Sequence, residues 1–222
     1  MAAVVEAKAF FETELPAKYA QGVRDLEARV RKLEARLAGV MAAEAVVRIV
    51  LRGEGGGDWT LRLAAGQLRV EATAQSEARL MSLVQSAADF KAAQEGAVSL
   101  GFGGADREDK AQPGGPGPAA GLMRFLTGPR IERLRTLAGT LRFVVTSVDG
   151  DPERTWSLTL VLGPGEPPDP PDKADCTISV GHADSKLMAE GKLAPPAAFM
   201  AGKVKIAGNM GLAMQLGSLM MG

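Results

Sequence analysis

The sequence predicts an α+β fold that occurs twice in tandem within the 222 residues of the chain. Short alternating runs typical of strands occur in both halves, together with segments of helical periodicity. A stretch rich in glycine and proline at 103–118 separates the two halves. These observations divide the chain into a diverged first repeat at 1–105, a linker at 106–118 and a second domain at 119–222.

The first expected element is a long amphipathic helix that follows Pro16. Its apolar residues alternate in steps of four and three, with charged residues between them: Tyr19, Val23, Leu26, Val30, Leu33, Leu37 and Val40. Pro16 suits the first turn, where a missing backbone N–H is tolerated. The simpler prediction is that this helix packs on a sheet. A coiled-coil dimer is the alternative, because the pattern continues for about three heptads.

The rest of the first half is predicted to consist of strands and one short helix. Alternating apolar residues indicate strands at 45–51, 59–63 and 67–73, which form a meander. A helix is expected at 77–84 and a further short strand at 97–102.

The second half is predicted to repeat this order. A helix is expected at 122–137, although Gly128-Pro129 must break or kink it. The proline-rich stretch 163–172 cannot lie inside a sheet. The remaining expected elements are strands at 140–148, 155–162, 176–180 and 203–207 and helices at 185–190 and 209–221.

Matching short sequences support the idea of a duplication. Trp59-Thr-Leu-Arg-Leu corresponds to Trp156-Ser-Leu-Thr-Leu at an offset of 97 residues. Arg79-Leu-Met corresponds to Lys186-Leu-Met at an offset of 107 residues. The difference between these offsets equals the length of the proline-rich stretch, which is taken as an insertion in the second copy.

Composition and charge exclude several classes of function. Lysine plus arginine and aspartate plus glutamate number 26 each, so no overall charge attracts the chain to nucleic acid. Cys176 is the sole cysteine, which excludes an internal disulfide and favours a reducing compartment. The N-terminus does not resemble a signal peptide, and the uncharged stretch 206–222 is too short and polar to span a bilayer. We therefore expect a cytoplasmic protein without a transmembrane segment.

No catalytic or metal-binding arrangement is predicted. His182 stands alone and is expected to be a surface loop residue, while Cys176 is expected to be a structural thiol. The acidic segment 149–153 is expected to form a hairpin turn, because it is too short for a calcium loop. Gly101-Phe-Gly-Gly104 is not followed by a helix and does not indicate a phosphate loop. The chain is therefore not predicted to be an enzyme.

Three ordered motifs near the C-terminus resemble those of a known family. They are Lys173-Ala-Asp-Cys-Thr-Ile, Lys186-Leu-Met-Ala-Glu-Gly-Lys-Leu and the run from Ala198 to Leu216. Together they resemble the sterol carrier protein type-2 family over about 121–222. The resemblance implies a twisted, largely antiparallel sheet of about five strands, covered by helices on one face, with an apolar tunnel between them. The stretch 163–172 departs from the family, which usually has another strand-forming segment there.

The same resemblance implies a function and a site. Family members bind fatty acids, acyl-CoA, phospholipids or sterols without a cofactor, so a lipid carrier or transfer protein is expected. The residues add that the final helix has almost no polar face and that four of the ten methionines lie within 210–222. The predicted lipid-binding site lies between this helix and the second sheet, and its expected lining comes from Trp156, Leu158, Leu160, Met188, Phe199, Met200, Ile206, Met210, Ala213, Met214 and Leu216.

Two other classes of function are left open by the sequence. One is an accessory or dimerisation module that docks through its apolar C-terminal helix, which would otherwise expose a large apolar surface. The other is an enzyme that cyclises a hydrophobic substrate in an apolar cavity. A homodimer and transient membrane contact are also left open. The first half is expected to bind lipid weakly or not at all, because it lacks a counterpart of the methionine-rich ending.

Overall fold

The described strands form a single mixed sheet. The computed structural model describes residues 13–71, 79–96, 98, 126–168 and 173–221. Within these residues the sheet has eight strands in the order β3-β2-β1-β4-β6-β5-β7-β8. Their bounds are β1 Ala45–Arg52, β2 Gly57–Ala64, β3 Gln67–Glu71, β4 Met81–Ser86, β5 Gly139–Thr146, β6 Trp156–Leu162, β7 Cys176–Gly181 and β8 Val204–Gly208. The expected sheet of about five strands is therefore wrong, because both halves contribute strands to one sheet.

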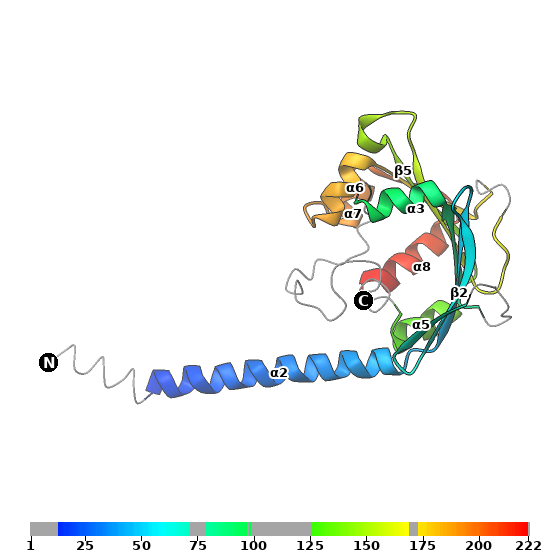
Figure 1. The fold of residues 1–222 in the computed structure, drawn as a ribbon. Coiled ribbons are helices and arrows are strands. Elements are labelled where there is room, and N and C mark those ends of the chain that lie inside the picture. Colours follow the sequence, from blue (N-terminus) through cyan, green and yellow to red (C-terminus); the bar gives the residue numbers. More distant parts are fainter. Residues whose placement is uncertain (1–12, 72–78, 97, 99–125, 169–172, 222) are drawn as a thin grey trace.

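Helices lie on one side of this sheet, as the resemblance implied (Figure 1). The longest helix, α2, instead extends away from the lower end of the sheet. A short 3-10 turn, η3 at Val148–Gly150, joins β5 to β6. The bounds of the helices are α2 Leu15–Met41, α3 Ala87–Gln94, α5 Gly128–Arg135, α6 His182–Ala189, α7 Pro195–Met200 and α8 Met210–Met221.

The pairing of the strands is mostly antiparallel, as expected. Strand pairs β1–β2, β2–β3, β4–β6, β5–β6 and β7–β8 are antiparallel, whereas β1–β4 and β5–β7 are parallel. The two halves meet where β4 pairs with β6. This edge of β6 is free to accept β4 because β6 ends at Leu162 and the prolines that follow cannot continue as a paired strand.

The helix predicted at 77–84 is wrong in its described part, because the chain from Met81 onward is strand β4. Residues 77 and 78 lie outside the described residues. A short apolar run does not distinguish a helix from a buried strand, and here pairing with β1 on one edge and β6 on the other favours the strand. The helix begins only after Ser86, whose hydroxyl accepts a hydrogen bond of 2.9 Å from the Asp89 backbone N–H.

Gly128 and Pro129, which were predicted to break or kink a helix at 122–137, form the first turn of α5. Residues 126 and 127, which precede them, are not helical. Ile131 and Leu134 on this helix are buried in the core. The predicted segment 122–125 lies outside the described residues, as do the strand expected at 97–102, apart from Val98, and the linker at 106–118.

The second correspondence used to support the duplication is wrong. Arg79-Leu-Met leads into strand β4, which begins at Met81, whereas Lys186-Leu-Met lies within helix α6. The first correspondence joins two strands that each pair with the strand before them: Trp59 in β2 pairs with Ile49 of β1, and Trp156 in β6 pairs with Val145 of β5. Three-residue matches of apolar character are therefore poor evidence for equivalent structure.

The proline-rich stretch follows β6 onto the side of the sheet opposite the helices (Figure 1). Its Glu166 forms ion pairs with Arg79 at 2.5 Å and with Arg48 at 2.8 Å. Arg48 also forms a salt bridge of 2.7 Å with Asp58 on the neighbouring strand. Hydrogen bonds from the two arginines hold the pKa of the Glu166 carboxyl below its ordinary value. The segment between β6 and β7 is thus tied to strands of the first half.

Candidate functional site

One face of the sheet, which we call the inner face, is apolar from β3 to β8. Directly paired residues of neighbouring strands project from the same face, so the register assigns each side chain to a face. Leu61 pairs with Val47, and Leu83 pairs with Leu160, on the side of the helices. Following the register across the sheet gives Leu68, Val70, Leu61, Leu63, Val47, Ile49, Met81, Leu83, Leu160, Leu162, Leu141, Phe143, Cys176, Ile178 and Ile206.

Helix α8 closes the part of the inner face formed by the second half. Its buried residues recur with helical spacing and pack into the main core cluster: Leu212, Ala213, Leu216 and Leu219. Asn209 caps the helix by accepting a hydrogen bond of 3.1 Å from the Leu212 backbone N–H. Gly208 has a φ of 89°, and an added Cβ would lie 2.2 Å from the Asp175 carbonyl oxygen, so only glycine fits at this junction.

The opposite side of α8 is not buried. Met210 and Met214 are 41% and 69% exposed, respectively. The described residues of the first half therefore leave these two side chains uncovered, and cover by a second subunit stays a prediction. A helix that lies on a sheet buries one stripe, and its sequence of apolar residues does not show which stripe that is.

A second, smaller cluster closes the upper end of the sheet. Trp156 packs there with Val145, Val148 and Val98, and its indole Nε1–H donates a hydrogen bond of 2.7 Å to the backbone carbonyl of Asp89. This bond fixes helix α3 over β6. Burial raises the pKa of the Asp89 carboxyl. Trp156 is therefore a structural anchor between the two halves.

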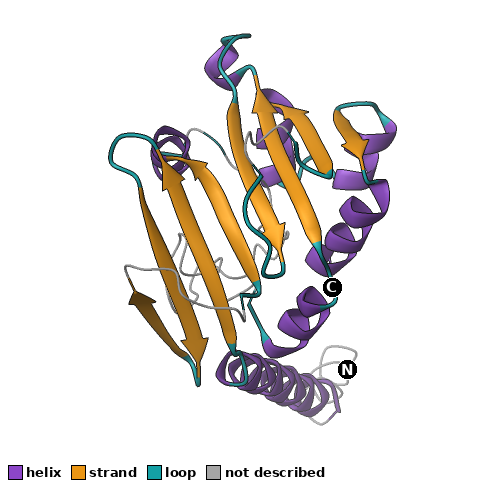
Figure 2. Ribbon diagram, turned by 90° about the vertical axis from the view of Figure 1, so that its right-hand side faces the viewer, coloured by secondary structure: helices purple, strands orange, loops and turns teal. Residues whose placement is uncertain are grey.

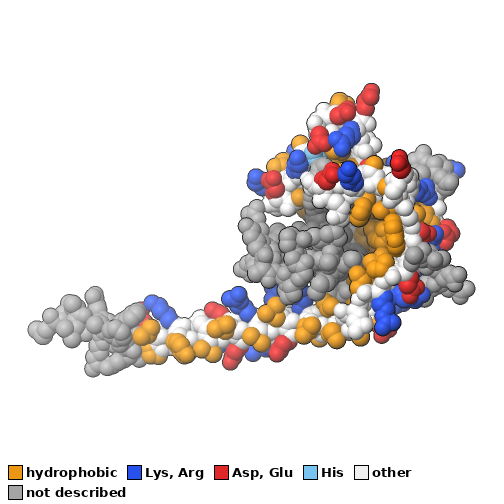
Figure 3. All heavy atoms as spheres, in the orientation of Figure 1, with side chains coloured by type: hydrophobic (Ala, Val, Ile, Leu, Met, Phe, Trp, Pro, Cys, Tyr) orange, Lys and Arg blue, Asp and Glu red, His pale blue; other side chains and the backbone are white. Residues whose placement is uncertain are grey.

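The described residues cover only part of the inner face formed by the first half. Ile49, Leu61, Leu63 and Leu83 border the core cluster but are only partly buried. Leu68 and Val70 on the edge strand β3 are exposed. Figure 3 shows hydrophobic side chains gathered on this side of the sheet. Figure 2, which views the sheet from its other side, shows most of the described helices behind or beside the strands of the second half. We call the six residues Ile49, Leu61, Leu63, Leu68, Val70 and Leu83 the open apolar face.

The predicted site residues fall into three groups in the structure. Four lie together in the core between α8 and the sheet: Leu160, Ile206, Ala213 and Leu216. Two belong to the upper cluster with α3: Trp156 and Leu158. The remaining five lie on helices, with Met188 partly buried and the others exposed: Phe199, Met200, Met210 and Met214. The open apolar face was missed, although the alternation of apolar residues within 45–51 and 59–63 could have indicated it.

His182 and Cys176 are both buried in the folded chain. His182 is buried at the start of α6 and accepts a hydrogen bond of 3.0 Å from the Asp149 backbone N–H through Nδ1, so the predicted surface position is wrong. The sequence around a single histidine does not show that a distant turn will cover it in the folded chain. Cys176 is buried in the core, and burial raises the pKa of its thiol, as expected for a structural cysteine. A wide, shallow hollow of about 560 Å³ beside His182 is lined by Lys186 and turn residues and does not adjoin the open apolar face.

The fold and the site thus define an α+β protein with one apolar, partly open sheet face. Residues 127–221 match the family described as "SCP-2 sterol transfer family". The resemblance predicted over about 121–222 is therefore confirmed for this region. The match leaves the first half of the chain outside it. Among the described residues, no helix is both long enough and apolar enough to cross a membrane.

Curated relatives match the same part of the chain. "Sterol carrier protein 2" of Rattus norvegicus is 44% identical over 89 residues, which are 40% of this chain and 16% of the relative. The protein of that name from Homo sapiens is 40% identical over 87 residues, or 39% of this chain and 16% of the relative. "Hydroxysteroid dehydrogenase-like protein 2" of Danio rerio is 36% identical over 117 residues, or 50% of this chain and 27% of the relative. The chain therefore spans only a small part of these longer relatives.

Solved structures of similar domains also match. The sterol carrier protein domain 2 of Helicoverpa armigera is 31% identical and covers 40% of this chain and 71% of that domain, with a TM-score of 0.30. Sterol carrier protein 2 from Yarrowia lipolytica in its apo form is 22% identical and covers 41% and 73% of the two chains, with a TM-score of 0.31. Scores of this size carry no argument about the arrangement of the whole chain.

Proposed function

We propose that this protein binds an apolar, lipid-like molecule, such as a fatty acid, acyl-CoA, phospholipid or sterol, and acts as a carrier. The observation that carries the proposal is the open apolar face beside the core under α8. Large apolar surfaces left partly exposed are uncommon in soluble proteins and usually mark interaction sites. The match of 127–221 to a sterol transfer family favours a lipid as the molecule that covers this surface.

The proposed ligand lies along the inner face, from the edge of α8 towards β2. Leu160 and Leu216 would border its inner end, and Leu61 and Leu63 would lie beneath its outer end. Burying a chain of about 16 carbons releases roughly 13 kcal/mol at about 0.8 kcal/mol per methylene, before the cost of association. One methylene changes binding by only about 1 to 3 kcal/mol, so the site would discriminate weakly between chain lengths.

Titration with a fluorescent fatty acid tests the proposal and its location. Leu61→Arg places a charge in the middle of the open apolar face, where an apolar ligand would leave the arginine without a polar partner. We expect this variant to bind the fatty acid at least tenfold more weakly than the unaltered protein. Ala64→Arg is the matched control, because Ala64 lies three residues away on the same strand, is exposed and faces the opposite side. It should bind as the unaltered protein does.

Both variants are first checked for an unaltered far-ultraviolet circular dichroism spectrum. Equal binding by Leu61→Arg and the unaltered protein would contradict the location on the first-half strands. No uptake of fatty acid by the unaltered protein, together with no co-purifying lipid in native mass spectrometry, would refute lipid binding itself.

We further propose that the first half is a diverged copy of the second. Support comes from the strand order, which is β2-β1-β4 in the first half and β6-β5-β7 in the second, with the same parallel and antiparallel pairings. An eight-residue helix follows the parallel strand in each half, after Ser86 and after Gly181, at an offset of 95 residues. The first half then lacks a counterpart of α8 among its described residues, which leaves its inner face open.

A further inference from the structure

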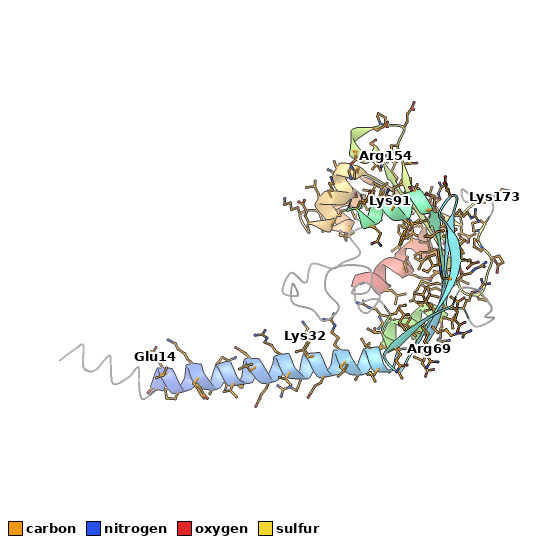
Figure 4. The ribbon with its side chains drawn as sticks, in the orientation of Figure 1. Glu14, Lys32, Arg69, Lys91, Arg154 and Lys173 are labelled. Atoms are coloured by element: carbon orange, nitrogen blue, oxygen red, sulfur yellow. The ribbon has the colours of Figure 1, made fainter. Side chains whose placement is uncertain are left out.

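Helix α2 has an apolar stripe that nothing in the described structure covers. None of its residues from Leu15 to Met41 is buried, so the prediction that it packs on the sheet is wrong. Figures 1 and 4 show the helix extending away from the sheet, with Lys32 labelled midway along it. The apolar residues of the stripe are 39% to 75% exposed: Tyr19, Val23, Leu26, Val30, Leu33 and Leu37.

A helix in this position needs a partner. Its 27 residues span about 40 Å at 1.5 Å per residue, which is long enough for several turns of contact. Most helical stability in proteins comes from packing of the amphipathic face, and here that packing is absent within the described part of the chain. The stripe is narrow, because one apolar residue recurs alternately every four and three positions, which is the spacing of a coiled-coil seam.

The residue types along the seam select the kind of coiled coil. Steps of three lead from a to d in a heptad, which places Val23, Val30 and Leu37 at a and Leu26 and Leu33 at d. β-Branched residues at a, combined with leucine at d, favour two parallel strands. The central part of the seam, from Val23 to Leu33, has this pattern, whereas Tyr19 at d and Leu37 at a depart from it. The centre of the seam is therefore suited to a parallel, two-stranded coiled coil.

The charges beside the seam show which partner fits. In this register Arg29 and Arg36 occupy g positions, and Glu27 and Glu34 occupy e positions. In a parallel pair of identical helices, Arg29 of each copy faces Glu34 of the other copy, so both contacts are attractive. In an antiparallel pair, g faces g and e faces e, so arginine would meet arginine and glutamate would meet glutamate.

We propose that α2 is a dimerisation helix, and that its partner is the α2 helix of a second copy of this chain in parallel orientation. The proposal is independent of lipid binding, because it rests on a helix that projects from the sheet. An anionic membrane surface is a poorer partner. Interfacial helices use a broad apolar face with Trp, Phe and Leu, whereas Tyr19 is the sole aromatic residue of α2.

Sedimentation equilibrium of the full chain tests the stoichiometry. The unaltered protein should have twice the chain mass of 23.1 kDa at micromolar concentration. Leu33→Lys places a charge at a d position in the centre of the seam and should give the mass of a single chain. Ala35→Lys is the matched control, because Ala35 is exposed at an f position on the opposite side of the helix, and this variant should remain a dimer. Since α2 contributes no buried residue, the rest of the fold should survive both changes.

Charge reversal tests the orientation. Arg29→Glu turns two attractive contacts of the parallel dimer into repulsions and should weaken dimerisation by about tenfold. Adding Glu34→Arg to the same chain restores opposite charges and should recover the affinity of the unaltered protein. In an antiparallel dimer, Arg29→Glu would instead relieve repulsion and strengthen association.

Three results would overturn the proposal. The first is an unaltered protein that is monomeric; if this monomer also floats with vesicles rich in anionic lipid, the stripe belongs to a membrane. The second is a dimer whose mass is unaffected by Leu33→Lys, which would place the dimer contact on another surface. The third is a dimer that is lost with Leu33→Lys but strengthened by Arg29→Glu, which would refute the parallel orientation.

Discussion

Truncation of Leu216 to alanine is expected to destabilise the protein strongly. Leu216 is 3% exposed and lies in the main core cluster, where α8 packs on the inner face. Its loss removes buried apolar area worth about 1.5 to 3 kcal/mol and leaves a cavity, for a total of about 2 to 5 kcal/mol. In a chain of 222 residues each kcal/mol lowers the melting temperature by about 2 to 4 °C. Urea denaturation followed by tryptophan fluorescence measures the change.

Met214→Ala provides the matched comparison on the same helix. Met214 loses a side chain of similar size but is 69% exposed, so its truncation should cost about 0.5 kcal/mol or less. The ratio of the two losses in unfolding free energy thus shows which stripe of α8 faces the sheet. If both truncations cost the same, or if Met214→Ala cost more, the placement of α8 and the assignment of the core beneath it would be refuted.

Three further predictions concern individual contacts. Glu166→Gln should lower stability at pH 7 by about 1 kcal/mol or less, because the carboxylate is exposed. The pKa of Glu166 is lowered, first by Arg79, so this contribution to stability is present above the ordinary glutamate pKa and fades below about pH 4. Urea midpoints at several pH values would check this, with Glu54→Gln as the control. Trp156→Phe removes the bond to α3 and should increase amide exchange throughout 87–94, and unchanged protection there would count against its role as an anchor. The Cys176 thiol should react with a disulfide reagent only in denaturant; rapid reaction of the native protein would contradict its burial.

Elements fixed by local pattern were predicted well from the sequence. Strands β1, β2, β5 and β6 alternate in apolar character, and their hairpin turns carry glycine, so their positions follow from short segments alone. The special role of Gly128-Pro129 in a helical segment was also predicted, because proline chemistry depends on one or two residues, although the pair begins α5 and does not break a described helix. Such signals are contained in the segment itself and need no knowledge of its neighbours.

Elements fixed by distant neighbours were predicted poorly. β4 is a strand because β1 and β6 lie on its two edges, and the sequence of 81–86 does not contain that information. The same limit applies to the site. The residues predicted to line the site from the final helix are apolar, but the stripe of α8 that meets the sheet depends on the angle at Gly208. Of the three, Ala213 and Leu216 are buried against the sheet, whereas Met214 lies on the exposed side of the helix.

The joining of the two halves explains why neither is expected to be complete alone. Without β4, strand β6 would expose an unpaired edge, which is a template for association with other chains. The main core cluster also draws on both halves, since Val47 and Met81 are buried with Leu212 and Leu216. The proline-rich stretch after β6 cannot form a paired strand. It is held in place by ion pairs of its Glu166 with Arg48 and Arg79 of the first half. The first half therefore completes the sheet of the second, and among the described residues its own inner face is the part that is only partly covered.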